Sequence, residues 1–306
     1  MNASQDRHAA QRQARSGFWF GLGAYGLWGV LPIYFKAVDE VGAIDIVAHR
    51  VIWSVPFLIF LLFTFGGAGE LRRIIREPKT IRFLALTALL IATNWLLYVY
   101  AVVSGQILAG SLGYYLNPLV NVLMGRLLLK ERLSWLQWAA VAVAAVGISV
   151  LAFQAMGQLW ISLVLAVTFA TYGLLRKIAP VEATSGLTVE TTLILPLALA
   201  WLAWGIADGR PVFGSTDFET MLLLLAGVAT TVPLILFTAA ARRLRYSTLG
   251  MLQFIAPTLQ FVIAVAIYGE AFTTAHAIAF GAIWVALALY VFSLARQARA
   301  AVTLPE

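Results

Sequence analysis

Apolar blocks of about 20 residues recur along the chain, and they constrain its fold more than any other feature. A helix of about 20 residues crosses the roughly 30 Å of hydrocarbon in a bilayer. Helices satisfy their own backbone hydrogen bonds in lipid, whereas open strands cannot. We expect ten membrane-spanning helices joined by short loops. The expected spans are 17–37, 44–66, 81–103, 106–128, 134–153, 157–176, 186–207, 218–240, 247–268 and 273–295.

The composition supports a chain in contact with lipid. Hydrophobic residues make up 61% of the chain and charged residues 11%, with a mean hydropathy of +0.88. Too few polar groups remain to cover a water-facing surface, which excludes a soluble globule, a disordered chain and a fibre. The absence of cysteine excludes disulfides, thiolate metal sites and cysteine nucleophiles. The sequence predicts an all-α polytopic membrane protein without a cofactor or a metal site.

The basic residues predict how the chain is oriented. Eighteen of the 21 Lys and Arg residues flank the spans on one side, Lys36 and Arg210 lie on the other, and Arg50 lies within a span. This asymmetry is the positive-inside signature, so both termini are expected in the cytoplasm, with tails at 1–16 and 297–306. The positive charge faces lipid headgroups, which accounts for the net charge of +7 without a nucleic-acid partner.

A weak internal repeat divides the chain into two similar halves. Pro118 and Glu131 are 13 residues apart, and Pro257 and Glu270 have the same separation. We place the halves at 17–153 and 157–296. Each half holds five spans, so the second must enter the membrane from the opposite side. Inverted repeats of this kind are common in secondary transporters, which bind substrate near the bilayer midplane.

Three ionisable residues fall deep within the spans: His49, Arg50 and Glu190. Burying such a group in hydrocarbon costs at least about 2.5 kcal/mol, so each requires a reason. Arg50 lies six residues before Pro56, and Glu190 lies six before Pro196. One hypothesis is that both line a central polar cavity, with Glu190 as the candidate proton-coupling group. The alternative is that each anchors neighbouring helices.

Uncharged polar and aromatic residues form a second candidate group. Amides beside aromatic rings suit an organic ligand that has flat apolar parts and hydrogen-bonding parts. Such groups also bridge helices, or anchor the chain at the membrane interface. Together with His49, Arg50 and Glu190, the candidates for substrate binding are Asn94, Trp95, Tyr98, Tyr114, Asn117, Asn121, Tyr172 and Gln253. The wider polar set includes Tyr100, Tyr115, Thr230, Thr231 and Gln260.

Small residues mark the fifth and tenth spans as close-packing helices. Ala140 and Ala144 are four residues apart, as are Ala277 and Gly281, so each pair shares a helix face. Faces of this kind permit close helix contact. We expect them at the periphery of any site, where they could also form a homodimer contact.

Several strings resemble one known family. They are AHRVIWS (48–54), NWLLYVYAV (94–102), SLGYYLNPLVNVL (111–123), KERLSWLQW (130–138), TYGLLRK (171–177), GLTVETTLILP (186–196), FTAAARRLRYSTLG (237–250) and QFIAPTLQF (253–261). Together they resemble the drug/metabolite transporter superfamily, EamA type, and its RarD branch. The resemblance covers nearly the whole chain and implies a permease of the bacterial inner membrane. It supplies no catalytic residues.

The leading interpretation is a permease that moves a small organic metabolite or drug by alternating access. Its driving force would be either proton coupling through Glu190 or passive facilitation. An intramembrane enzyme is the first alternative, but the chain lacks HExxH, a glycine-rich phosphate loop and an acidic metal cluster. His49 also has no evident serine partner. The second alternative is a membrane sensor that does not transport.

Overall fold

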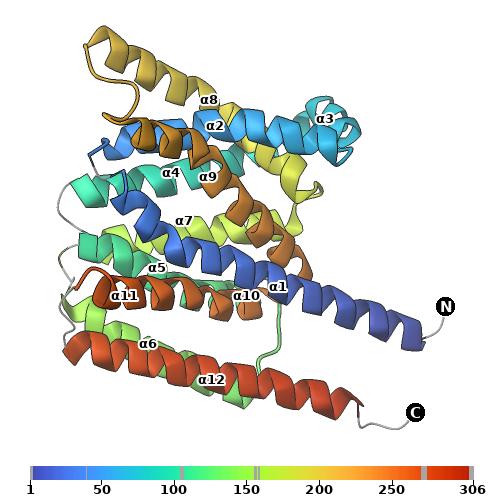
Figure 1. Cartoon of the computed structure of the whole chain (residues 1–306). Coiled ribbons are helices and arrows are strands. Elements are labelled where there is room, and N and C mark those ends of the chain that lie inside the picture. The colour runs from blue at the N-terminus through green and yellow to red at the C-terminus, as the bar shows by residue number, and fades with distance from the viewer. Residues whose placement is uncertain are drawn as a thin grey trace.

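The chain folds into a bundle of helices (Figure 1). The computed structural model describes residues 3–38, 40–103, 107–154, 157, 159–269 and 274–302. Twelve helices lie within these ranges. They are α1 (Ala3–Lys36), α2 (Ala43–Thr64), α3 (Ala68–Ile75), α4 (Pro78–Val103), α5 (Ile107–Leu127), α6 (Trp135–Gln154), α7 (Leu159–Ile178), α8 (Ala183–Ala207), α9 (Asp217–Arg243), α10 (Tyr246–Gln253), α11 (Ile255–Ala266) and α12 (Thr274–Val302).

Each of the ten expected spans coincides with helical structure. Eight helices in the described ranges are long and apolar enough to cross a membrane, namely α1, α2, α4, α6, α7, α8, α9 and α12. This confirms an all-helical, multi-pass architecture. Ten crossings and an inverted repeat remain predictions, and Glu270, on which the repeat partly rests, lies outside the described residues.

The expected single helix at 247–268 is wrong, because the chain breaks there at Phe254 into α10 and α11. The physical reason is Pro257, which has no N–H to donate to the carbonyl of Gln253. Regular bonding resumes only at Thr258, whose N–H donates to the carbonyl of Phe254 at 3.1 Å. The break places polar backbone in the middle of the bundle.

Helical structure extends beyond the expected spans in three places. Helix α3 is short and amphipathic, which is why no apolar block predicts it. Helix α1 begins at Ala3 and α12 continues to Val302, so much of both expected tails is helical. The tails are rich in Ala, Gln and Arg, which favour helices even outside an apolar block.

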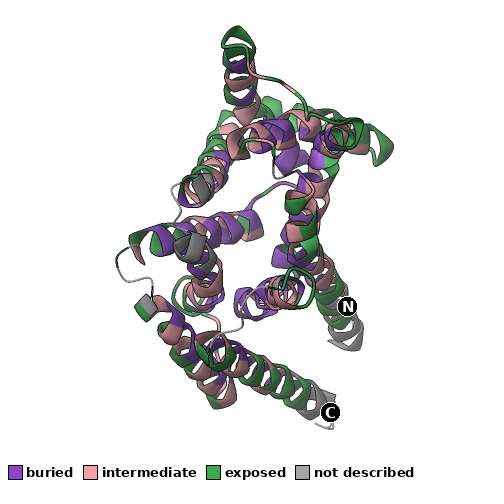
Figure 2. Ribbon diagram, turned by 60° about the vertical axis from the view of Figure 1, so that its left-hand side comes forward, coloured by how far each residue is buried: buried purple, intermediate pink, exposed green. Residues whose placement is uncertain are grey.

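Both chain ends lie at the same end of the bundle, together with α3 (Figure 1). Buried residues face the inside of the bundle, and exposed residues lie along its outer face (Figure 2). The outer face carries large apolar side chains such as Phe63, Leu89 and Leu197, which are 74%, 64% and 71% exposed. This apolar exterior is suited to hydrocarbon rather than water.

Helices α6 and α12 pack closely against each other at one side of the bundle. A Cβ atom on Gly147 would lie 2.6 Å from the Cβ of Ala282, so only glycine permits this approach. Ala140 and Ala144 are fully buried. The small-residue face of α6 therefore contacts α12 of the same chain. The predicted pair on α12 is not part of this close contact, because Ala277 is exposed and a Cβ on Gly281 would meet nothing within 4 Å.

Candidate functional site

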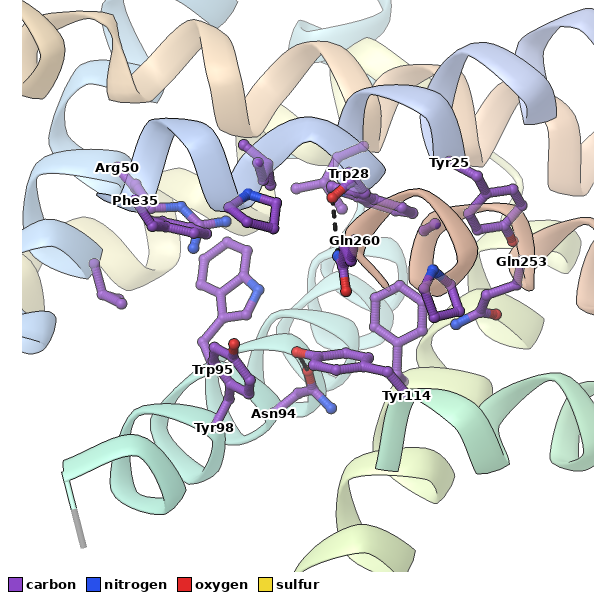
Figure 3. A pocket seen from close by; sticks show the side chains of 17 residues that line it. Tyr25, Trp28, Phe35, Arg50, Asn94, Trp95, Tyr98, Tyr114, Gln253 and Gln260 are labelled. Carbon is purple, nitrogen blue, oxygen red and sulfur yellow. Dashed lines mark hydrogen bonds between the residues drawn. The ribbon is translucent and has the colours of Figure 1, made fainter. Parts of the chain in front are cut away.

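A cavity of about 180 Å³ lies inside the bundle, between α1, α2, α4, α5, α7, α9, α10 and α11 (Figure 3). Its wall combines aromatic rings, aliphatic side chains and two prolines with two glutamines, Asn94 and one cation, Arg50. No Asp or Glu belongs to the wall in the part of the chain that the structure describes. Arg50 and Gln253 lie at opposite ends of the cavity (Figure 3).

Arg50 is held by one hydrogen bond and two aromatic rings. Its Nε donates to Thr230 Oγ1 at 2.8 Å, and the guanidinium carbon lies 5.1 Å from the ring centroid of Trp95 and 5.7 Å from that of Phe35. The Thr230 hydroxyl donates to the carbonyl of Ala226 at 2.8 Å, so its lone pair is free to accept. Cation–π contacts of about 2 kcal/mol when desolvated offset part of the cost of this deep charge.

Arg50 has no carboxylate within 4.0 Å among the residues that the structure describes. The acid on the same helix, Asp45, is engaged elsewhere. Its carboxylate accepts from Trp201 Nε1 at 2.8 Å and pairs with Arg210 at 3.8 Å. The cavity therefore has a positive charge at one end that no acidic side chain of the described ranges balances.

A close crossing of α2 and α9 sets the position of Arg50. A Cβ on Gly227 would lie 2.2 Å from the carbonyl carbon of Trp53. Ser54 Oγ lies at the same crossing, 2.5 Å from the carbonyl oxygen of Arg50 and 3.3 Å from that of Gly227. Glycine thus lets the two backbones meet, and Thr230, about one turn further along α9, reaches the guanidinium.

Prolines expose polar backbone beside the cavity. Pro32 has no N–H for the carbonyl of Trp28, one turn earlier in α1. Gln260 Nε2 of α11 donates to that carbonyl at 3.0 Å (Figure 3). Pro257 likewise leaves the carbonyl of Gln253 without its helical donor, and both residues line the cavity.

Aromatic rings and amides form the wall opposite α1. Asn94 Nδ2 donates to the carbonyl of Leu165 at 2.9 Å and to Thr168 Oγ1 at 3.0 Å, which joins α4 to α7. The hydroxyl of Tyr114 lies 3.5 Å from Asn94 Oδ1, and the rings of Tyr98 and Tyr114 are 5.4 Å apart. These contacts fix the rings, so the wall is organised without a ligand.

Six of the eleven predicted site residues line the cavity: Arg50, Asn94, Trp95, Tyr98, Tyr114 and Gln253. The other five lie outside its wall. They are His49, Asn117, Asn121, Tyr172 and Glu190.

Asn117 and Asn121 lie on one face of α5, as the sequence predicts, but they join helices instead of lining the cavity. Asn117 Nδ2 donates to the carbonyl of Ala166 at 2.8 Å. Asn121 Nδ2 donates to Asn117 Oδ1 at 3.1 Å and to Gln253 Oε1 at 3.0 Å. The pair therefore orients Gln253, leaving its Nε2 to face the cavity (Figure 3).

His49 ties α2 to the loop after α8. Its Nδ1 accepts from Trp53 Nε1 at 3.1 Å, so Nε2 carries the proton and donates to the carbonyl of Val212 at 2.6 Å. Both ring nitrogens are thereby used by the protein. The geometry gives His49 a role in joining the two segments.

Glu190 and Tyr172 belong to a separate buried cluster. The carboxylate accepts from the hydroxyls of Thr87 and Tyr172, the latter at 3.3 Å, and lies 3.5 Å from Arg176 Nη1. Both side chains of the ion pair are buried, with exposures of 0% and 1%. Glu190 thus differs from its expected position, because its charge is compensated within α7 and α8 rather than presented to the cavity. Arg176 also donates to the carbonyl of Ala183 at 3.0 Å.

The site residues predicted from the sequence include none of the residues of α1, which forms one wall of the cavity. Tyr25, Trp28, Pro32 and Phe35 of α1 all line it. Their spacing of three to four residues places them on one helix face, which is the signal that could have found them. Gln260 also lines the cavity; it stood in the wider polar set but not among the chosen residues.

The fold and the cavity define a multi-pass helical membrane protein with an internal compartment, and comparison with known proteins gives its family. Residues 15–153 match the EamA-like transporter family. An uncharacterized transporter of Pseudomonas aeruginosa is 47% identical over 95% of this chain and 98% of its own length. Protein RarD of Salmonella typhimurium is 45% identical over 92% of this chain and 96% of its own length.

The chain belongs to the EamA-like family of the drug/metabolite transporter superfamily, and within it to the RarD-type permeases. It is a membrane transporter. A solved crystal structure, 22% identical, matches it with a TM-score of 0.71 over 92% of this chain and 99% of that chain, which shows a shared fold. Several relatives are named as transporters, in agreement with a protein that is not an enzyme.

Proposed function

We propose that this protein is a secondary transporter that moves a small organic solute across the bacterial inner membrane by alternating access around the central cavity. The observation that carries the proposal is the composition of the cavity wall. It combines aromatic rings with amides and one cation, and it draws on helices from both halves of the chain. Such a wall suits an organic ligand with apolar and polar parts.

Helix contacts support two halves that repeat the same design. When the helices of the two halves are matched in chain order, α1 corresponds to α7, α2 to α8, α4 to α9, α5 to the α10–α11 pair, and α6 to α12. Helix α1 contacts α9 and α11, and its counterpart α7 contacts α4 and α5. Helix α2 contacts α9, as α8 contacts α4. The contacts α2–α8, α5–α10 and α6–α12 each join a helix to its own counterpart.

Two polar contacts obey the same correspondence between the halves. Arg50 of α2 bonds to Thr230 of α9, and Glu190 of α8 bonds to Thr87 of α4. A charged residue six positions before a proline thus meets a threonine in both halves. We infer ten crossings in two inverted repeats, because five spans in each half reverse the direction of the second.

Alternating access requires contacts at the two ends of the bundle to open in turn. At the end with the termini, Lys177 Nζ donates to the carbonyl of Ala241 at 2.8 Å, and Glu131 binds the start of α10. At the opposite end, Tyr34 donates to the carbonyl of Leu222 at 3.0 Å, and His49 contacts Val212. We propose that these two sets of contacts open alternately.

We propose that the end with the termini and α3 faces the cytoplasm, as the distribution of basic residues predicts. The native chain has no cysteine, so single cysteines report position without a background. A membrane-impermeant maleimide should label Ser215→Cys in intact cells whose outer membrane has been removed. It should label Glu77→Cys only after lysis. The opposite pattern would reverse the orientation.

Proton coupling through Glu190 stays a prediction. Its ion pair with Arg176 favours a structural role, because the charge already has a partner outside the cavity wall. Uptake into proteoliposomes with and without a pH gradient would test it. If Glu190→Gln removes the gradient effect but keeps the rate measured without a gradient, coupling is supported; an equal wild-type rate in both conditions would exclude it.

Transport itself can be tested by comparing metabolites in cells that lack and cells that overproduce the protein. Solutes that change in opposite directions are then measured in exchange assays with proteoliposomes. Trp95→Ala should lower exchange at least tenfold, because it removes a ring of the cavity wall. Trp160→Ala, on the exposed face of α7, is the matched control and should leave exchange unchanged. No exchange of any such solute would contradict the proposal.

A further inference from the structure

We propose that the transported solute is an organic monoanion whose carboxylate pairs with Arg50. This inference rests on the proposed transport function and specifies the chemical class of the substrate. The inference starts from the charge of the cavity. One end of the cavity is positive, and no acidic side chain is among the described residues of its wall.

The guanidinium keeps two donor groups for a ligand. Its Nε bonds to Thr230, which is the only hydrogen bond that the described residues give to this side chain. Nη1 and Nη2 therefore have no protein acceptor in those ranges. A planar carboxylate matches the fork of arginine donors, and a charge-assisted bond of this kind is strong in a region of low dielectric.

The remaining wall indicates the rest of the ligand. Trp95 lies beside the guanidinium, and the rings of Tyr98 and Tyr114 continue the wall from it (Figure 3). They would contact a flat apolar group. At the far end, Gln253 Nε2 faces the cavity, because Asn121 already binds its Oε1. A hydrogen-bond acceptor on the solute would meet it there.

A single carboxylate fits better than a phosphate or a cation. Arg50 is the only Lys or Arg of the described cavity wall, so the wall supplies one positive charge. A doubly charged phosphate would keep an excess charge in a low-dielectric site, and a cation would be repelled by Arg50.

Binding of three matched probes to the purified protein tests the inference. Phenylacetate, phenylacetamide and phenethylamine share one ring and differ in charge, and affinity is measured by calorimetry at one pH and salt concentration. The carboxylate should bind at least tenfold more tightly than the amide, and the amine should bind least. Arg50→Gln should remove this preference, and Arg50→Lys should keep part of it.

Arg243→Gln is the matched control, because this arginine also lies over a ring, 5.0 Å from that of Phe20, but outside the cavity. It should leave the preference unchanged. Equal or tighter binding of the amide or amine, no binding of phenylacetate, or a preference that survives in Arg50→Gln would overturn the inference. Exchange of a neutral or cationic solute in proteoliposomes would overturn it while the transport function stands.

Discussion

Gln260 donates its side-chain N–H to the backbone carbonyl of Trp28 at 3.0 Å, across the contact between α11 and α1. That carbonyl is the one that Pro32 leaves without a helical donor. A free carbonyl in hydrocarbon is costly, and a neighbouring helix can supply the missing donor. The bond therefore supplies the donor that Pro32 cannot provide, and it also holds the α1 wall of the cavity in place.

Gln260→Leu should lower the free energy of unfolding by about 1–3 kcal/mol, because it leaves the carbonyl of Trp28, inside the bundle, without a donor. The measurement is denaturant unfolding of the purified protein. Pro32→Ala restores the helical donor, so Gln260→Leu should cost less in that background. If Gln260→Leu lowers stability equally in both backgrounds, the loss of stability does not come from the unpaired carbonyl of Trp28.

Gly227→Ala should destabilise the protein by about 1–3 kcal/mol, because its new methyl group would meet the backbone of Trp53 at 2.2 Å. The same change should weaken the bond between Arg50 and Thr230. Gly281→Ala, with nothing within 4 Å of the new atom, is the control and should be neutral or slightly stabilising. Thermal unfolding compares the two variants, and equal melting temperatures would contradict the close crossing.

Glu190→Gln should cost about 3–5 kcal/mol of stability, because it removes the negative partner of a fully buried arginine. The double variant Arg176→Gln with Glu190→Gln should recover part of this loss, since it leaves no charge behind. Glu182→Gln, at an exposed carboxylate nearby, should change stability by less than about 0.5 kcal/mol. Wild-type stability of Glu190→Gln would rule out a structural ion pair.

Glu131→Ala should loosen the start of α10. The carboxylate accepts from the N–H groups of Tyr246 and Ser247, at 2.5 Å and 3.0 Å, and thus caps the helix. Loss of such a cap costs about 1 kcal/mol, which corresponds to roughly fivefold faster amide exchange at these two residues. Hydrogen exchange measures it. Glu77→Gln, on an exposed side chain, should leave both rates unchanged.

The sequence could identify Arg50 as a candidate because a cation within an apolar run requires a reason. It could not separate Arg50 from Glu190, since both are deep charges before a proline. The difference is tertiary: Arg176 approaches Glu190 because Gly186, where a Cβ would lie 2.2 Å from Arg176 Nη1, leaves room for it. At the equivalent position of the first half, Arg50 contacts Thr230 and the rings of Trp95 and Phe35.

The aromatic wall of α1 shows the same limit. Trp28 and Phe35 are typical of any membrane helix, where rings pack, anchor the chain or bind ligands equally well. Their spacing gives them one face, but which neighbour that face meets depends on how the helices cross.

The sequence by itself determined the helical, membrane-embedded class of this protein, because the length and apolarity of its segments leave no other way to satisfy the backbone in lipid. Tertiary structure alone decided which polar groups face the cavity and which join helices. The reason is that the role of a buried polar group, lining the cavity or joining helices, depends on the group that it bonds to. Those partners lie up to 232 residues away in the chain, as for Gln260 and Trp28, where periodicity carries no information.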